Sequence, residues 1–442
     1  MSIRLSDHFS YGRLLRFSLP SILMMVFTSI YGVVDGYFIS NYVGKTPFAA
    51  VNFIMPFLML LGGLGFMVGS GGSALIGKLL GEGKPQQARS LFSMLVYITV
   101  AVALLIAAAG ELVLEPVARA LGADDTLLPD CVRYGRIILL GLPALMLQFE
   151  FQSFYVTAEK PQMGLYVTLA AGCTNMLLDW LLVGVLRWEV EGAAVATVAS
   201  QCVGGLLPVL YFLRPNQSLL RIGKAGFDGR ALWKVLSNGA SEFVSNISMS
   251  VVSMLYNAQL MKYAGEDGVA AYGVLMYVCF IFISIFVGFS VGTAPIISYH
   301  YGARDTKELR SLLRKGLLII SGFATIMLAA GELLARPLSV LYVGYDELLM
   351  RMTLRAFRIF SFSFPFAAVP IFGSSFFTAL NDGRSSAAIS FLRTMVFQIA
   401  AVLLLPLVFG LDGIWISLVA AELAATAVTV IFWVAKQRKY QY

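Results

Sequence analysis

Two polar stretches, GEGKPQQARSLF at residues 81–92 and GARDTKELRSLL at residues 302–313, each separate two long apolar runs. Both begin with glycine, both carry Arg-Ser-Leu at the same place, and they lie 221 residues apart. The same ungapped shift aligns one half of the chain on the other, which predicts an internal repeat. The most informative further pairs are Gly44 with Gly265, Gly71 with Gly292, Gly110 with Gly331, Pro116 with Pro337 and Gly192 with Gly413.

The composition places the chain among membrane proteins. Of its 442 residues 58% are hydrophobic and 13% are charged, whereas soluble domains carry roughly 25% charged residues. So few polar side chains cannot cover a soluble protein of this size, and we predict an all-α polytopic membrane protein. The net charge of +7 lies in short clusters between apolar runs, which indicates membrane topology and no nucleic-acid partner. The four cysteines show no metal-ligand spacing, and no cofactor is expected.

About 20 apolar residues are needed for each membrane crossing, and this length predicts twelve transmembrane helices. Each half contributes six, so both halves enter the membrane with the same orientation and form a parallel repeat. The predicted division is an N-lobe of residues 1–213, a cytoplasmic linker of residues 214–230 and a C-lobe of residues 231–442. The predicted helices are 14–40, 47–77, 89–113, 131–157, 162–186, 192–213, 231–262, 268–299, 309–334, 350–378, 386–409 and 413–435.

The distribution of basic residues predicts the orientation. With the N-terminus inside, 22 of the 32 lysines and arginines fall in cytoplasmic segments. The positive-inside rule therefore predicts that both termini are cytoplasmic. The first apolar run is long enough to remain as a span, and no cleaved signal peptide is expected.

Two acids, Asp35 and Asp179, lie inside predicted helices with no lysine or arginine near them in the chain. At about 1.5 Å per residue they lie roughly 13 and 12 Å below the outer boundary, and Asn175, Thr197 and Tyr31 fall at similar depth. Tyr31 and Asp35 are four residues apart and share one helix face, as do Asn175 and Asp179. We therefore expect two helices to present oxygen-rich faces at one level.

This group of five predicts a cation site. Two carboxylates in a low dielectric do not both ionise readily, so the site is expected to bind a proton near neutral pH. A Na⁺ ion coordinated by Asp35, Asn175, Asp179 and Thr197 would offset both charges equally well. Pro20 lies in the inner part of the first predicted helix, where it removes a backbone hydrogen bond and permits a bend. We expect this bend to couple cation binding to movement.

The chain resembles the multidrug and toxic compound extrusion (MATE) transporters of the MOP superfamily over its whole length. The resemblance rests on the twelve helices, the two lobes and the motifs VDGYFISNYVG at 34–44, AAVNFIMP at 49–56 and GEGKPQQARSLF. It implies a monomeric antiporter of the cell (inner) membrane that works by alternating access within the lipid. Such a protein exports small organic cations or amphipathic drugs in exchange for H⁺ or Na⁺, without a cofactor. In the DinF-like branch, the ion-coupling positions match Tyr31, Asp35, Asn175, Asp179 and Thr197.

The second lobe departs from the first. The 221-residue shift places Tyr256 opposite Asp35, so the C-lobe lacks a copy of the N-lobe acid. Glu242, with Tyr256, is a candidate substrate counter-ion or second coupling group. Glu242 could equally be a residue of the cytoplasmic helix end that pairs with Lys234. Glu150 and Glu422 could likewise be functional acids or residues with a structural role.

The residues also bear on two alternative functions. An intramembrane enzyme would need a nucleophile with a base or a metal-ligand motif, and HExxH, GxSxG and P-loop patterns do not occur in the sequence. A lipid-linked oligosaccharide flippase of the same superfamily would favour several basic residues in its cavity for a pyrophosphate. Only Arg393, near the inner third of its predicted span, is placed where it could face such a cavity. The sequence therefore favours a secondary transporter, with the flippase as the alternative.

Overall fold

The computed structural model describes residues 3–121, 123 and 125–442, without the side chains of Val33, Ser40 and Lys45. Every regular element of this described part is helical. The N-lobe contains α1 (Tyr11–Phe38), the π-helical segment η1 (Ile39–Val43), α2 (Lys45–Gly81), α3 (Pro85–Leu121), α4 (Leu128–Leu140), α5 (Leu142–Thr157), α6 (Pro161–Leu178), the π-helical segment η2 (Asp179–Val185) and α7 (Glu189–Leu213). The C-lobe contains α8 (Gly229–Gly302), α9 (Thr306–Val343), α10 (Glu347–Ser361), α11 (Phe364–Ala379), α12 (Gly383–Phe391), the π-helical segment η3 (Leu392–Phe397), α13 (Gln398–Phe409) and α14 (Leu411–Tyr440).

The first helix of the C-lobe, α8, crosses the bundle twice. Its 74 residues would span about 110 Å as one straight helix, several times a bilayer's hydrocarbon thickness. Gly265 breaks the helix with a φ of 62° and a ψ of −151°, a conformation that glycine adopts without a Cβ clash. The two halves correspond to the predicted helices 231–262 and 268–299.

Two helices predicted as continuous are bent in the structure. The predicted helix 131–157 is divided into α4 and α5 with a bend of 59°, and the predicted helix 350–378 into α10 and α11 with a bend of 48°. Both second halves carry a proline in their first turn, Pro143 and Pro365. A proline there cannot continue the preceding hydrogen-bond pattern and starts a new helix, which the prediction of unbroken spans overlooked.

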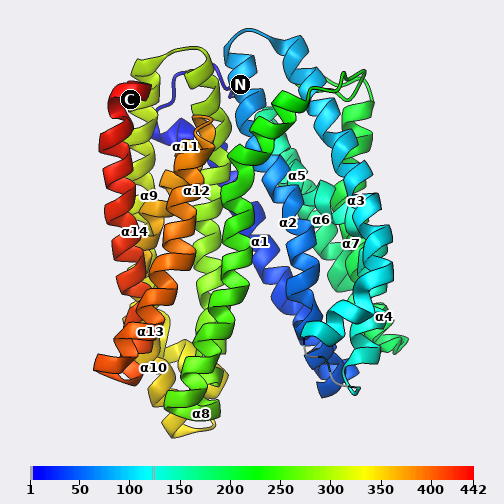
Figure 1. The fold of residues 1–442 in the computed structure, drawn as a ribbon, viewed down its shortest axis with the longest axis vertical. Coiled ribbons are helices and arrows are strands. Elements are labelled where there is room, and N and C mark those ends of the chain that lie inside the picture. Colours follow the sequence, from blue (N-terminus) through cyan, green and yellow to red (C-terminus); the bar gives the residue numbers. More distant parts are fainter. Residues whose placement is uncertain (1–2, 122, 124) are drawn as a thin grey trace.

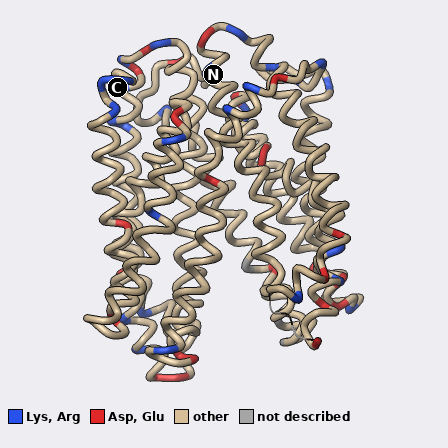
Figure 2. The backbone as a smooth tube through the Cα atoms, in the orientation of Figure 1, with Lys and Arg blue, Asp and Glu red and all other residues tan. Residues whose placement is uncertain are grey.

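The described residues contain nine helices that are long and apolar enough to cross a membrane, or eleven when each bent pair is one span. Because α8 crosses twice, twelve crossings result, as predicted. Charged residues gather at the two ends of the bundle and are sparse along its middle (Figure 2). Such a distribution fits a hydrocarbon layer around the middle of the helices.

Polar caps define where several helices begin. The side chains of Asp228, Asp305, Asp346 and Asp382 each accept a hydrogen bond from a backbone N–H at the first turn of α8, α9, α10 and α12. Ser10 does the same for α1. Such caps satisfy amide groups that have no partner within the helix.

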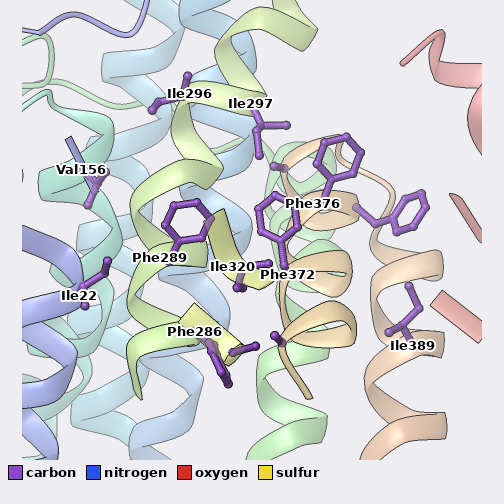
Figure 3. Packing of buried hydrophobic residues seen from close by; sticks show 14 of the residues in the cluster. Ile22, Val156, Phe286, Phe289, Ile296, Ile297, Ile320, Phe372, Phe376 and Ile389 are labelled. Atoms are coloured by element: carbon purple, nitrogen blue, oxygen red, sulfur yellow. The ribbon is translucent and has the colours of Figure 1, made fainter. Parts of the chain in front are cut away.

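The two lobes lie side by side, and both termini lie at the same end of the molecule (Figure 1). The ribbons of the lobes meet near this end, here called the termini end, and separate toward the opposite end (Figure 1). One buried apolar cluster joins the lobes, with Ile22 and Val156 from the N-lobe and Phe289 and Phe372 from the C-lobe (Figure 3). A second cluster, which includes Ile54 and Tyr134, belongs to the N-lobe alone.

The backbones of the lobes touch at two glycines that are repeat partners. A Cβ at Gly81 would lie 2.0 Å from the carbonyl oxygen of Tyr299, and a Cβ at Gly302 would lie 2.1 Å from that of Lys78. Lys78 and Tyr299 are themselves separated by 221 residues. The pseudo-twofold axis of the repeat therefore passes through this contact between α2 and α8.

Candidate functional site

The N-lobe brings four predicted polar residues together from α1, α6 and α7. Asp35 on α1 faces Asn175 on α6, Asp179 at the start of η2 and Thr197 on α7. Tyr31 lies one turn before Asp35, and its Oη accepts a hydrogen bond of 3.4 Å from Nε2 of Gln148. The five residues singled out in the sequence thus occupy one region of the lobe.

This cluster is buried and its polar atoms lack partners. Asp179 is fully buried and Asn175 is 2% exposed, while Asp35 and Thr197 are partly exposed. Six buried atoms form no hydrogen bond in the described structure: Oδ1 of Asp35, both amide atoms of Asn175, both carboxylate oxygens of Asp179 and Oγ1 of Thr197. Each unsatisfied buried polar atom costs about 1–3 kcal/mol. A bound cation or a shared proton would supply the missing partner.

The two carboxylates have no positively charged neighbour in the described structure. Among the described residues, no lysine, arginine or histidine acts on Asp35 or Asp179. The donor set consists of two carboxylates, an amide oxygen and a hydroxyl, all oxygen ligands of the kind that hard cations prefer. The same pair of acids can also hold one proton between them. The residues therefore fit either ion.

The helices are locally irregular where the charged residues lie. Asp179 is the first residue of η2, and η1 begins four residues after Asp35. In the C-lobe, Arg393 lies within η3. A π-helical segment inserts an extra residue into the helix and is frequent at functional sites. Each of the three π-helical segments in the described chain therefore contains a charged residue of a span or begins within about one turn of one.

Sequence reasoning missed two members of the site. Tyr134 on α4 is fully buried beside Thr197 and the two carboxylates, and its hydroxyl contacts Sδ of Met55 at 3.7 Å. Gln148 on α5 reaches Tyr31. Both are polar groups inside the predicted helix 131–157. At about 1.5 Å per residue from its outer end they lie at about 5 and 26 Å, so depth alone would not have grouped them with the other five.

Pro20 lies inside α1 at the contact between the lobes. Its neighbour Ser18 lies so close to α8 that a Cβ at Gly292 would be 2.9 Å from the Cα of Ser18. Pro20 itself is buried. A change of bend at Pro20 would therefore move the Asp35 end of α1 against a segment held by the C-lobe.

The C-lobe candidates do not form a second site together. Tyr256 is 2% exposed, bonds Oγ of Ser417 at 2.6 Å and stacks on Tyr272 with ring centroids 5.1 Å apart. Tyr256 follows Glu242 by fourteen residues on α8, about 21 Å along the helix. Glu242 is partly exposed, Arg393 is the basic residue that influences it electrostatically, and among the described residues it forms no ion pair with Lys234.

The two acids left open in the sequence have different surroundings. Glu422 on α14 is 1% exposed and bonds the guanidinium of Arg393. Glu150 on α5 is fully buried near Thr99, and neither of its carboxylate oxygens has a hydrogen-bond partner in the described chain. Glu422 is thus half of an ion pair, whereas Glu150 is not.

The fold and the clustered residues define a polytopic membrane protein with two six-span lobes and a buried group of acidic and polar side chains in one of them. A family model described as MatE matches residues 20–181 in the N-lobe and 243–404 in the C-lobe. The chain belongs to this family, and the resemblance to the MATE transporters is confirmed.

Named relatives and solved structures agree with this assignment. The chain is 25% identical over 418 residues to multidrug export protein MepA of Staphylococcus haemolyticus, covering 93% of this chain and 90% of the relative. It is 23% identical over 430 residues to MepA of Staphylococcus aureus, covering 97% and 94%. A solved structure titled as the outward-facing conformation of a multidrug resistance MATE family transporter of the MOP superfamily superposes with a TM-score of 0.92 at 20% identity, covering 98% and 97%. This last similarity establishes the fold.

Proposed function

We propose that the protein is a cation-coupled multidrug efflux antiporter that works by alternating access. It exports small organic cations or amphipathic drugs, and a proton or Na⁺ moves inward in exchange. The observation that carries the proposal is the meeting of Asp35 and Asp179 inside the N-lobe without a basic partner. The relatives named as multidrug export proteins support the substrate class.

Cation binding at this site would change how closely α1 packs on η2 and α7. Without a cation, two carboxylates and their unpartnered neighbours oppose close packing of α1 on η2 and α7. A proton or Na⁺ removes one net negative charge and satisfies buried oxygens, so the packed arrangement is favoured. Pro20 allows the outer part of α1 to change its angle while Ser18 stays against the C-lobe. Substrate release would follow from this movement.

The positive-inside bias supports cytoplasmic termini in an inner-membrane, multi-pass arrangement. The lobes meet at the termini end, so on this proposal the structure represents a state open to the outside (Figure 1). We propose a monomer embedded in lipid, with the lobes divided at residues 213 and 231. Tyr256 has a structural role in this scheme because it is enclosed in the C-lobe.

The flippase alternative is not favoured. It depended on a basic group available to bind a pyrophosphate, and Arg393 was the candidate. The guanidinium of Arg393 already forms a bidentate pair with Glu422. A group bound in this way is not available to an anionic lipid headgroup.

Transport by Asp35→Asn tests the proposal. In everted vesicles, ethidium should move when either a pH gradient or a Na⁺ gradient is imposed, and the gradient that drives movement identifies the ion. Asp35→Asn removes one ionisable carboxyl and should abolish driven transport, while Glu115→Gln, which removes an exposed acid of α3 that pairs with Arg119, should transport like the parent. Full coupled transport by Asp35→Asn would overturn the proposal. Proton release and ²²Na⁺ binding to the purified protein then give the ion directly.

A further inference from the structure

The N-lobe contains a second buried acidic position, away from the Asp35 site, that the proposed transport cycle does not use. Glu150 on α5 is fully buried, and neither of its carboxylate oxygens has a hydrogen-bond partner in the described chain. Its polar neighbour, Thr99 on α3, is buried as well, and Oγ1 of Thr99 also lacks a partner. Two helices thus bring a carboxyl and a hydroxyl together without satisfying either group.

Glu150 lies inside the N-lobe and away from the contact between the lobes. A Cβ at Gly69 of α2 would lie 2.9 Å from the Cα of Glu150. Gly71, on the other side of α2, faces the C-lobe instead, because a Cβ there would lie 2.1 Å from the carbonyl oxygen of Val235. With Thr99 on α3, three helices of the N-lobe enclose Glu150 on the side of α2 that does not contact the C-lobe.

Glu150 has no charged neighbour among the described residues. It is the only charged residue of α5. Along α2 and α3 the charged residues closest to Gly69 and Thr99 are Lys78 and Arg89, about 13 and 15 Å away along the helices. The other titratable side chains of these helices face other groups or lie further along: Tyr97 donates to the carbonyl oxygen of Gly223, Tyr155 faces Gly164 of α6, Lys45 begins α2, and Glu111, Glu115 and Arg119 lie in the last third of α3.

The fold does not require polar groups at these two positions. The 221-residue shift places Ile371 opposite Glu150 and Ile320 opposite Thr99. Ile320 is fully buried, and Ile371 packs against the same apolar cluster (Figure 3). The C-lobe thus packs hydrocarbon at the place where the N-lobe buries a carboxyl and a hydroxyl. Each unpartnered buried polar group costs about 1–3 kcal/mol, which indicates that Glu150 and Thr99 have a role other than packing.

Hydroxyl groups follow Glu150 along α5 toward the termini end. Ser153 and Thr157 come three and seven residues after Glu150 and therefore share its face of the helix. Oγ1 of Thr157 forms a hydrogen bond of 2.7 Å with Oγ of Ser73 on α2. Thr157 is the last residue of α5, about 10 Å from Glu150 along the helix, and Glu159 just beyond it accepts a backbone N–H of the N-terminal segment at 2.6 Å. Because a hydroxyl both donates and accepts, this face offers groups that can carry a proton to the termini end.

We propose that Glu150 is a second proton-binding site of the N-lobe, which is loaded in the state that the structure represents and releases its proton toward the termini end during the transport cycle. An ionised carboxylate buried without a partner is so unfavourable that the group binds a proton instead. When a change of conformation admits water from the termini end, the O–H bond of Glu150 breaks and the proton passes to that water through the hydroxyls of Ser153 and Thr157. A proton from the opposite end of the lobe then restores the acid. The inference rests on the proposed function, and it requires a proton whether the Asp35 site binds H⁺ or Na⁺.

Infrared spectroscopy of purified protein in lipid nanodiscs tests whether the site is loaded. The carbonyl band of a protonated carboxyl group is separate from the bands of ionised carboxylates. The spectra are recorded at neutral pH in the background Asp35→Asn/Asp179→Asn, so that the acid pair does not contribute. In this background Glu150→Gln should lower the protonated-carboxyl band by the area of one carboxyl group. Glu115→Gln, which removes an exposed acid of α3, is the matched control and should leave the band unchanged.

A substitution copied from the C-lobe keeps the test valid if Glu150→Gln prevents folding. Thr99→Ile combined with Glu150→Ile installs the pair that the C-lobe already packs at the equivalent place, so the melting temperature in detergent should stay at the parent value or rise. This variant should still bind ethidium, but its pH-gradient-driven ethidium transport in everted vesicles should fall at least about tenfold, as expected when a proton-transfer group is removed. Glu150→Asp keeps an ionisable carboxyl and should retain driven transport.

The outcomes separate this inference from the proposed function. An unchanged carboxyl band in Glu150→Gln would show that the site is not loaded and would overturn the inference. Driven transport at the parent rate by Thr99→Ile/Glu150→Ile would show that the acid takes no part in the cycle and would overturn it as well. Full coupled transport by Asp35→Asn overturns the proposed function and leaves the infrared result on Glu150 unaffected.

Discussion

At the scale of the residue, Asp382 shows how one carboxylate fixes the end of a chain. It lies between α11 and α12 and accepts hydrogen bonds from Oη of Tyr440 at 2.8 Å, Oγ of Ser385 at 2.9 Å and Nζ of Lys436 at 3.3 Å. Burial alone would raise the pKa of Asp382, but these donors outweigh it and lower the pKa below its ordinary value. The end of α14 is thereby attached to the C-lobe.

Asp382→Asn should destabilise the protein at neutral pH. A carboxylate whose pKa is lowered by folding stabilises the folded state above the unfolded value, near 3.9, and this stabilisation is lost as the pH falls through the folded pKa. Losing charged hydrogen bonds costs about 1–3 kcal/mol. The melting temperature in detergent should therefore fall at pH 7.5, and the difference from the parent should shrink only as the pH is lowered below about 4. Glu347→Gln, which removes only an exposed ion pair with Arg351, is the control and should leave the melting temperature unchanged. A difference that does not depend on pH would contradict this account of Asp382.

At the scale of the element, α1 combines three features along one helix. Pro20 lies at the contact with the C-lobe, Asp35 lies in the N-lobe site, and η1 follows at the end of the helix. Because Asp35 lies on the part of α1 beyond Pro20, a charge change at Asp35 can alter the angle of that part at Pro20, next to the contact with the C-lobe. In the proposed function, α1 is therefore the element that would link ion binding to lobe movement.

Pro20→Ala should slow transport without removing ion binding. Alanine restores the backbone hydrogen bond that proline lacks and resists bending. Substitutions along a coupling path change coupling by about 0.5–2 kcal/mol, so the ethidium transport rate should fall about two- to thirtyfold. Proton release or ²²Na⁺ binding should stay at the parent level. Pro116→Ala, an exposed proline inside α3, is the matched control, and turnover at the parent rate in Pro20→Ala would exclude the bend from the mechanism.

At the scale of the whole molecule, the lobes meet through glycines placed symmetrically about the repeat axis. Gly81 and Gly302 allow α2 and α8 to approach backbone to backbone at the termini end. Any side chain at either position would meet a carbonyl oxygen of the other lobe. The close contact between α2 and the second half of α8 at this end therefore depends on two residues without a Cβ, and Gly71 and Gly239 allow a similar approach of α2 to the first half of α8.

Gly302→Ala should shift the protein toward a state that is open at the termini end. Overpacking of this kind costs about 1–3 kcal/mol, which changes the ratio of two states roughly 5- to 150-fold. Spin labels at Gln86 and Lys307, both exposed and one in each lobe, should show a larger fraction of long distances in a background without the four native cysteines. Gly322→Ala, where a Cβ would meet nothing within 4 Å, should leave the distance distribution unchanged. A parent-like distribution in Gly302→Ala would show that the glycine contact does not control the opening at the termini end.

The predicted fold was confirmed where the information was local or periodic, and the structure places the five predicted site residues in one region of the N-lobe. The apolar lengths predicted twelve crossings, and depth along each helix predicted that Asp35 and Asp179 lie at one level. Depth says nothing about the direction in which a side chain points, so the partners Tyr134 and Gln148 were missed. The same limit applies to Glu422, whose partner Arg393 was noted in the sequence without being paired with it. Pro143 and Pro365 in the sequence indicated the two bends, but the prediction of unbroken helices overlooked them.

The sequence by itself determined the class of fold and the division into two similar halves. It could do so because helix hydrogen bonds are local and a hydrocarbon layer requires every backbone group of a span to be satisfied within its own helix. The tertiary structure alone decided which in-span charges are paired and which lack a partner. Those outcomes depend on contacts between helices far apart in the chain, such as Arg393 with Glu422 or Gly81 with Tyr299, and only the packing of the lobes fixes them.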